Sequence, residues 1–338
     1  MNKQLKALDN KLVDLKSTNG TVFVAPGLQG RIFCSIDEMM IHQFDAKLAA
    51  IPDPIEFNNI GGNSLWPAPE GGDFAFNYPP NNDEWLVQPA INIQCPTIVK
   101  QTNDSVIIEK NIELLNRKSC RAELLLQREV MVNDLELDGY DLRGISYSTH
   151  DAFSPLGEYM VDEFLLAAWS LEQFPGTEGI ITFGKVGGNA ANCINNDFYG
   201  DVGARLSFTD NLFTFRLGGI ERLQIGINRA SQPELIGAYD PARSLLIIRE
   251  TPLVEGKYIN IADNEQLSGP FSAEDVFSIF NGGELDFWEL ETIAPMKVEK
   301  GLWVGSWLES KTTILRGERE QLANYLATKF AINMDLIK

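Results

Sequence analysis

Residues 105–133 read SVIIEKNIELLNRKSCRAELLLQREVMVN, and the choice between strand and helix for this stretch decides the fold class. Residues 106–115 alternate apolar and polar side chains, as a strand with one buried face does. Residues 121–132 are rich in Ala, Leu, Glu, Gln and Arg, which favour a helix on propensity alone. Because residues 116–119 resemble a hairpin turn between two matching runs, we interpret the stretch as two long antiparallel strands. This interpretation favours an all-β fold.

The rest of the chain repeats this pattern of short apolar or alternating runs broken by Gly, Pro, Asn and Asp. Repeated strands without helical patterns between them are typical of an antiparallel sandwich rather than a βαβ sheet. Further strands are expected at 21–25, 31–36, 142–148, 179–184, 204–208, 212–217 and 244–250.

Three segments depart from the strand pattern. Leucines at helical spacing predict an amphipathic helix over residues 1–16, and similar spacing predicts a C-terminal helix over residues 317–331. Residues 59–96 are rich in Gly, Pro, Asn and Trp, which predicts a long ordered loop. Since neither a repeat nor an interdomain linker is evident, we expect a single domain over residues 1–338.

Charge limits the partners that the protein can have. The 47 acidic and 28 basic residues give a formal net charge of -19. Nucleic acids and anionic membranes are bound through clustered Lys and Arg, so we expect neither as a partner. The N-terminal residues lack the apolar stretch of a signal peptide, so we expect a cytoplasmic protein. The oligomeric state is left open.

Cysteines and histidines offer little for metal chemistry. Cys34, Cys95, Cys120 and Cys193 lie far apart without a CxxC pair, so we expect four free, buried thiols. With only two histidines and no Cys or His cluster, we expect no metal site and no cofactor.

The segment GGNSLWPAPEGG at 61–72 is the first candidate for ligand binding. Its glycines allow the backbone to approach a ligand, and Trp66 could stack on the apolar face of a sugar. Asn63 and Glu70 could hydrogen bond to hydroxyl groups. The alternative is a rigid surface loop whose Trp fills the edge of the core.

The segment GELDFWELETIAP at 283–295 is the second candidate. In a strand, Glu289 and Glu291 lie on one face, about 7 Å apart, because side chains alternate. Two like charges so placed are unfavourable unless something pairs them. The two alternatives are a solvated sheet face and a polar cleft that holds a ligand or a cationic side chain.

Three motifs together resemble the galactose mutarotase-like (aldose 1-epimerase-like) superfamily. They are QGRI at 29–32, the GGNSLWPAPEGG segment, and FWELETIAP followed by KVEKG at 297–301. The chain is most similar to an uncharacterised branch found in gut Bacteroidetes, over about residues 20–315. The resemblance implies a β-supersandwich with short terminal helices, and a small-molecule carbohydrate bound on its concave face.

The resemblance also implies roles for individual residues. A mutarotase moves protons with a carboxylate base and an imidazole acid. The family's base lies in a Leu-Glu-Thr motif, which corresponds here to Glu291. The nearest match to the family's acid motif is HDAFSPL, which begins at His150 and has Ser where the family has Asn. His150 could equally be a hydrogen-bonded loop residue, and His42 is expected to be structural.

Two arginines complete the candidate substrate-binding set of Arg31, Asn63, Trp66, Glu70, Arg222 and Glu289. Arg31 matches an early strand of the family, although an ion pair with Glu289 would use its geometry equally well. Two functions remain open: an aldose epimerase that uses Glu291 as base and His150 as acid, or a non-catalytic carbohydrate-binding protein with a degenerate site. A structural protein with a vestigial cleft is a third, weaker alternative.

Overall fold

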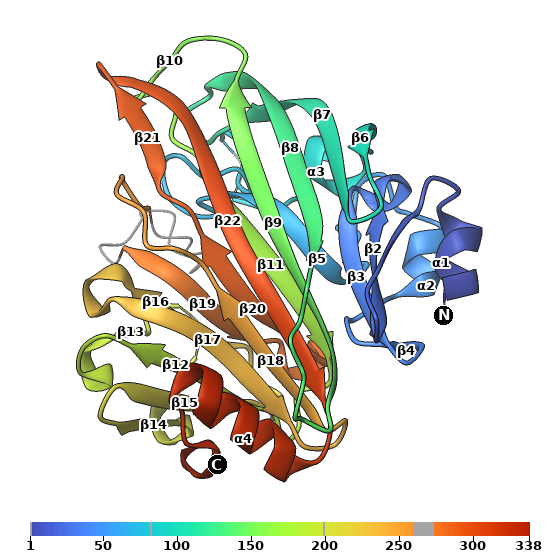
Figure 1. Cartoon of the computed structure of the whole chain (residues 1–338). Coiled ribbons are helices and arrows are strands. Elements are labelled where there is room, and N and C mark those ends of the chain that lie inside the picture. The colour runs from blue at the N-terminus through green and yellow to red at the C-terminus, as the bar shows by residue number, and fades with distance from the viewer. Residues whose placement is uncertain (1, 82, 199, 260–273) are drawn as a thin grey trace.

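Two large antiparallel sheets pack face to face to form a β-sandwich (Figure 1). The computed structural model describes residues 2–81, 83–198, 200–259 and 274–338. One sheet has ten strands and the other has twelve, and neighbouring strands such as β11 and β20 run antiparallel. The predicted all-β sandwich is therefore confirmed.

The ten-stranded sheet carries the site described below. Its strands, in order across the sheet, are β1 (Val13–Lys16), β2 (Gly20–Ala25), β3 (Arg31–Ile36), β5 (Gly62–Ala68), β11 (Ala167–Pro175), β20 (Phe287–Ile293), β19 (Asp275–Asn281), β16 (Leu223–Asn228) and β13 (Ile194–Asn195), with β4 (Met39–Met40) paired to β3.

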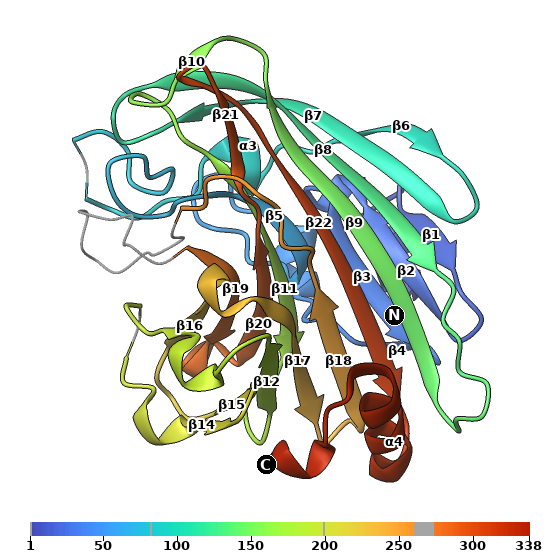
Figure 2. The same ribbon diagram turned by 60° about the vertical axis from the view of Figure 1, so that its left-hand side comes forward.

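The twelve-stranded sheet contains the longest strands, which run side by side along the molecule (Figure 2). Its strands, in order, are β14 (Leu206–Thr209), β15 (Leu212–Arg216), β12 (Ile181–Val186), β17 (Pro233–Asp240), β18 (Leu245–Glu250), β22 (Leu302–Arg316), β9 (Arg143–Pro155), β8 (Arg121–Asn133), β7 (Ser105–Leu115) and β6 (Thr97–Gln101), with β10 (Tyr159–Met160) and β21 (Met296–Glu299) paired to β22.

The predicted hairpin is β7 and β8, paired from Leu115–Arg121 to Ser105–Met131. Alternate side chains along both strands are buried, among them Ile108 on β7. The helix-favouring composition of β8 is overridden because strand pairing buries every second residue, which intrinsic propensity does not measure.

In the part of the chain that the structure describes, four short α-helices flank the sheets: α1 (Asn2–Leu8), α2 (Ala46–Ala50), α3 (Pro89–Asn92) and α4 (Arg319–Phe330). Helix α4 packs Leu322 and Leu326 on the outer face of the twelve-stranded sheet, as the predicted C-terminal helix should (Figure 1). Among the described residues, none of the helices has the length and apolar character needed to cross a membrane.

The predicted N-terminal helix over residues 1–16 is too long. Helix α1 ends at Leu8, and Val13–Lys16 forms β1 with alternating burial. Val13 and Leu15 face the core between the sheets, whereas Leu5 packs with a separate cluster around Phe33. The leucines thus belong partly to helix α1 and partly to strand β1. Their helical spacing across the boundary between these two elements is coincidental.

The predicted loop over residues 59–96 also needs correction, because it contains β5 and α3. Strand β5 pairs with β11 along its whole length but with β3 only through Ile32–Asn63. Beyond Asn63 one edge of β5 is therefore open, and Pro67, which lacks an N–H group, is tolerated there. The Gly and Pro content concealed this strand.

A buried ionic network crosses the interface between the sheets. Glu172 on β11 forms a salt bridge with Arg249 on β18, and both side chains are completely buried. The carboxylate of Glu172 also accepts hydrogen bonds from the Tyr147 hydroxyl, at 2.5 Å, and from Thr312, at 2.7 Å. Burial alone would raise the pKa of Glu172, but Arg249, His42 and Tyr147 together lower it to about 2.

The apolar core around this network draws on strands from Val13 to Ile314. Both sheets contribute to this cluster. A single domain over residues 1–338 stays a prediction.

We expect Glu172→Gln to lower the free energy of unfolding by about 3–5 kcal/mol, because the charge of Arg249 would remain buried without its partner. Urea denaturation followed by circular dichroism measures this loss. The matched control is Glu123→Gln, since Glu123 is exposed on β8. Equal stabilities of the two variants would contradict the role assigned to the network.

Candidate functional site

The two faces of β20 have opposite characters. Trp288 and Leu290 point into the core between the sheets, and Thr292 accepts a hydrogen bond from Arg249. Because side chains alternate along a strand, Glu289 and Glu291 point to the outer face of the ten-stranded sheet. The two carboxylates thus share one face, as the sequence predicted.

Side chains of neighbouring strands hold both carboxyl groups. The indole N–H of Trp169 donates to Glu291 Oε2 at 3.0 Å, and Gln224 Nε2 lies 3.4 Å from the same oxygen. Gln173 Nε2 donates to Glu289 Oε1 at 2.6 Å. The two carboxyl groups also hydrogen bond to each other. We call these five residues, Glu289, Glu291, Trp169, Gln173 and Gln224, the carboxylate site.

Both carboxyl groups hold a proton more tightly than a solvated glutamate does. Burial raises the pKa of Glu289 to about 7, and hydrogen bonds from Gln173 and Glu291 oppose that rise. Burial and then the charge of Glu289 raise the pKa of Glu291 well above its ordinary value. Because two close carboxylates cannot both ionise easily, the pair shares a proton near neutral pH.

A third carboxyl group lies on the same face. A Cβ atom placed on Gly226 would lie 2.3 Å from Asp275 Oδ2, so this carboxylate lies directly over Gly226. Gly226 pairs with Ser278, which in turn pairs with Glu291. Asp275 therefore lies two strands, about 10 Å, from Glu291.

The environment of Asp275 also favours its protonated form. Burial raises its pKa to about 7, although a hydrogen bond from Asn195 Nδ2, at 2.9 Å, opposes this rise. Among the described residues, Asp275 Oδ1 has no hydrogen-bond partner, and neither does Oε1 of Gln173. Two buried acceptors on one face are thus available to a ligand's donors.

Aromatic side chains border the carboxylate site. Trp66 and Trp169 are cross-strand neighbours on β5 and β11, with ring centroids 6.1 Å apart in an edge-to-face arrangement. Phe57 packs on the other side of Trp66 at 5.3 Å. Trp66 therefore lies on the same face as Glu291, but it is buried among aromatic rings, as in the alternative in which this Trp fills the edge of the core.

Arg31 reaches the same face from the start of β3. It donates to the carbonyl oxygens of Gly61 at 2.7 Å and Asn58 at 3.1 Å. Burial lowers its pKa to about 10, and the charge of Glu289 opposes this shift. Arg31 and Glu289 therefore interact electrostatically, but Arg31 is held by backbone carbonyls rather than by an ion pair.

Asn63, predicted to bind substrate, lies on the opposite face of β5. Its Oδ1 accepts a hydrogen bond from Arg128 Nη2 at 2.6 Å, and Arg128 also forms a salt bridge with Asp151 at 2.7 Å. Asn63 is completely buried between the sheets. It therefore ties the sheets together and is separated by the sheet itself from Glu291.

His150, predicted as the catalytic acid, does not meet Glu291. It lies on β9 in the twelve-stranded sheet, flanked by Glu129 and Glu309 on adjacent strands. Its neighbours Thr149 and Asp151 are buried, so His150 points to the opposite, exposed face. The predicted acid–base pair of His150 and Glu291 is wrong, because both sheets separate the two side chains.

Two further predicted residues lie just outside the strands of this sheet. Arg222 is exposed just before β16 begins. Glu70 is partly buried and follows the end of β5 at Ala68.

His42 is structural, as expected. Its Nδ1 accepts a hydrogen bond from the Cys34 backbone N–H at 2.9 Å, which requires an unprotonated Nδ1. Its Nε2 therefore carries the proton and donates to Glu172 at 2.8 Å. His42 thus belongs to the network between the sheets.

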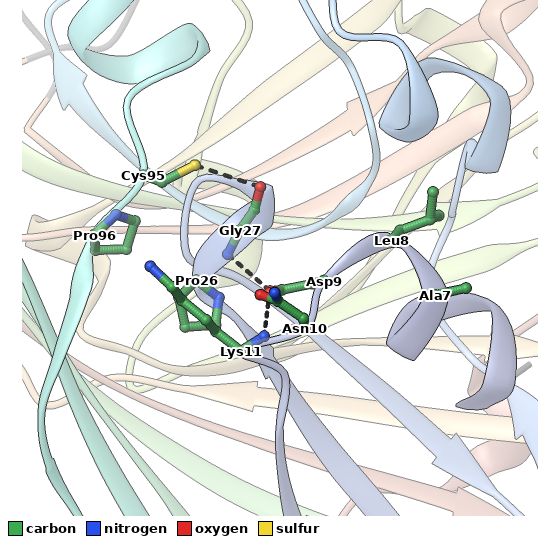
Figure 3. Close-up of a pocket in the computed structure, with 9 residues that line it drawn as sticks. All are labelled: Ala7, Leu8, Asp9, Asn10, Lys11, Pro26, Gly27, Cys95 and Pro96. Atoms are coloured by element: carbon green, nitrogen blue, oxygen red, sulfur yellow. Dashed lines mark hydrogen bonds between the residues drawn. The ribbon is translucent and has the colours of Figure 1, made fainter.

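The cysteines are free, but only Cys34 and Cys193 are buried, whereas Cys120 is half-buried and Cys95 is exposed. Cys95 borders a pocket of about 390 Å³ beside α1 (Figure 3). Polar groups of this pocket bond to each other: Asp9 accepts from the Gly27 N–H at 2.7 Å, and Cys95 donates to the Gly27 carbonyl at 3.4 Å. This pocket shares no residue with the carboxylate site.

Within the described ranges, no three His, Cys, Asp or Glu side chains gather in a metal-binding arrangement.

Several residues of this face were not singled out from the sequence. Trp169 and Gln173 alternate along β11, and that pattern could have indicated a second polar strand beside β20. Asp275 gave no such signal. The register between β16 and β19 shifts at Ile227–Asn228, so that Asp275 pairs with Asn228. This bulge turns Asp275 outward, although Phe277, two residues on, points inward.

We expect Glu289→Gln to be more stable than the natural protein at pH 8, by on the order of 2–3 kcal/mol. A carboxyl group with a raised pKa stabilises the fold fully below its unfolded pKa, and this contribution is lost as pH rises through about 7. The neutral amide avoids that loss. Melting temperatures at pH 5 and pH 8, with Glu123→Gln as control, test this; a gain that does not grow with pH would contradict it.

Comparison with solved structures identifies the type of fold. A candidate aldose 1-epimerase from Escherichia coli K12 is similar in structure with a TM-score of 0.51 and 13% identity, over 91% of this chain and 99% of that one. A galactose mutarotase-like protein from Lactobacillus casei has a TM-score of 0.50 and 10% identity, over 90% and 99%. The sandwich therefore has the galactose mutarotase-like fold.

Sequence comparison gives the family. No curated protein matches the sequence significantly. Residues 2–338 match the model of DUF6786, a family of unknown function, and the chain therefore belongs to that family.

Proposed function

We propose that the protein binds a carbohydrate at the carboxylate site. The observation that carries this proposal is the proton-sharing pair of Glu289 and Glu291, held by Trp169 and two glutamines on one sheet face. Carboxyl and amide groups together offer both acceptors and donors, which is what sugar hydroxyls require. The unpartnered acceptors on Gln173 and Asp275 add to that capacity.

One residue of the site matches what the family resemblance implies. The site lies on the outer face of the ten-stranded sheet, and Glu291 belongs to the Leu-Glu-Thr motif that suggested a catalytic base. The mutarotase-like fold supports sugar binding at such a face. Location in the cytoplasm and membership of a Bacteroidetes branch stay predictions.

Binding requires movement, because the carboxyl groups are closed off in the described structure. Glu291 is 1% exposed and Glu289 is 5% exposed. A pyranose can reach them only if covering side chains move, so the ligand must supply binding free energy for that opening.

We expect the natural protein to bind at least one member of a panel of aldoses, and Glu291→Gln to weaken that binding about 10-fold to 100-fold. The loss corresponds to one hydrogen bond to the singly charged pair of Glu289 and Glu291. Isothermal titration calorimetry measures the affinities, with Glu123→Gln as the unchanged control. If no aldose or larger glycan in the panel binds, the proposal fails.

Aldose 1-epimerase activity is the second candidate, and the shared proton favours it. The O1 and ring O5 atoms of a pyranose are bonded to the same carbon. One carboxylate of the pair can accept the O1 proton while the neighbouring carboxyl group donates its proton to O5, as the C1–O5 bond breaks. Two adjacent carboxyl groups can thus perform both transfers without an imidazole.

If the protein is an epimerase, Glu291→Gln should lower kcat/KM for anomer interconversion about 100-fold to 10,000-fold, since a positioned acid or base contributes that much. His150→Ala should leave kcat/KM unchanged, because His150 faces solvent on the other sheet. Polarimetry of a freshly dissolved pure anomer measures both variants. If the protein binds a sugar without accelerating anomer interconversion, the non-catalytic function is the one that stands. Loss of activity in His150→Ala would contradict the assignment of catalysis to the outer face of the ten-stranded sheet.

A further inference from the structure

A small cavity lies where β3 and β5 diverge, and three cationic side chains line it: Arg31, Lys110 and Arg128. Its volume is about 20 Å³, enough for one particle of the size of a water molecule. Ser64 adds a hydroxyl group to the wall, which is otherwise largely apolar.

Within the described ranges, one of the three cations forms a salt bridge with a carboxylate. Arg128 forms a salt bridge with Asp151, and its remaining hydrogen bonds go to Asn63 and the Gly30 carbonyl. With these partners, its charge is balanced and its donors are used.

Lys110 and Arg31 are held by neutral acceptors instead. Lys110 Nζ donates to the carbonyl oxygens of Ala90 at 2.6 Å and Gln94 at 2.9 Å. Besides its two backbone partners, Arg31 donates to Gln29 Oε1 at 3.4 Å. Among the described residues, neither cation forms a salt bridge, yet Arg31 is only 4% exposed and Lys110 only 7%.

Unused donors remain on these side chains. Lys110 has three N–H groups and two described acceptors, and Arg31 has five N–H groups and three described acceptors. A buried cation without a counter-ion destabilises the folded state. Consistent with that cost, burial and then the charges of the neighbouring Arg31 and Arg128 lower the pKa of Lys110 to about 7.

We propose that this cavity binds one small monovalent anion, a halide of the size of chloride, between Lys110, Arg31 and Ser64. The charge of the anion would balance a buried cation, and the spare N–H groups would donate to it. An apolar wall containing Leu65 and Leu126 suits a weakly hydrated halide. The proposal is independent of sugar binding.

Bromide provides a direct test, because it replaces chloride and scatters anomalously. Crystals of the full chain grown in sodium bromide should show an anomalous peak in the cavity, in contact with Lys110 Nζ. Anomalous peaks confined to the protein surface would overturn the proposal, and would mean that water or an uncharged lysine occupies the site.

Thermal unfolding provides a solution test at constant ionic strength. Replacing sodium gluconate by sodium chloride should raise Tm in a saturable way, by roughly 2–3 °C at a chloride concentration about ten times Kd. Lys110→Met should abolish the rise. Lys100→Met, at an exposed position on the adjacent β6, should retain it. An equal chloride response in Lys110→Met would overturn the proposal.

Two further measurements keep the test decisive. If Lys110→Met does not fold, Ser64→Ala should weaken chloride binding severalfold, and an unchanged affinity would count against the site. Inorganic phosphate should leave Tm at its gluconate value. A phosphate response that Lys110→Met removes would identify an oxyanion site and overturn the halide assignment.

Discussion

The salt bridge between Glu172 and Arg249 joins the two sheets in the middle of the sandwich, and it fixes which face of β11 is inside. Glu172 cannot turn outward without leaving Arg249 buried alone. Because side chains alternate, Trp169 and Gln173 must then point outward. Strand β20 is held to β11 by backbone pairing in a fixed register. The orientation of β11 therefore also places Glu289 and Glu291 on the outer face.

The protein buries carboxylates in two contrasting ways. Glu172 is surrounded by a guanidinium and three other donors, so its ionised form is favoured and it strengthens the fold. Glu289 and Glu291 have mainly each other and neutral amides, so their ionised forms are disfavoured. A group that costs stability near neutral pH and is held in a fixed geometry is characteristic of functional sites.

Features that depend on local alternation were predictable. Strands β3, β7 and β8 have the bounds that their sequence patterns indicated, and Glu289 and Glu291 share a face. Features that depend on tertiary pairing were not. The sequence around His150 does not reveal that β9 belongs to the other sheet, and the Gly and Pro residues of β5 conceal a strand that is stabilised by β11. Arg249, on which the interior depends, lies in an ordinary apolar run.

The bulge in β19 has a consequence for how the family can vary. Side chains alternate between the two faces of a strand. One extra residue therefore reverses which side chains face outward in the part of the strand that precedes it. Val276 is that extra residue, and it separates the inward Phe277 from the outward Asp275. A relative that lacks one residue here would keep the core from Phe277 onward intact and present a different side chain over Gly226. Length variation at this single position can therefore exchange a group on the outer face of the ten-stranded sheet without any substitution in the core.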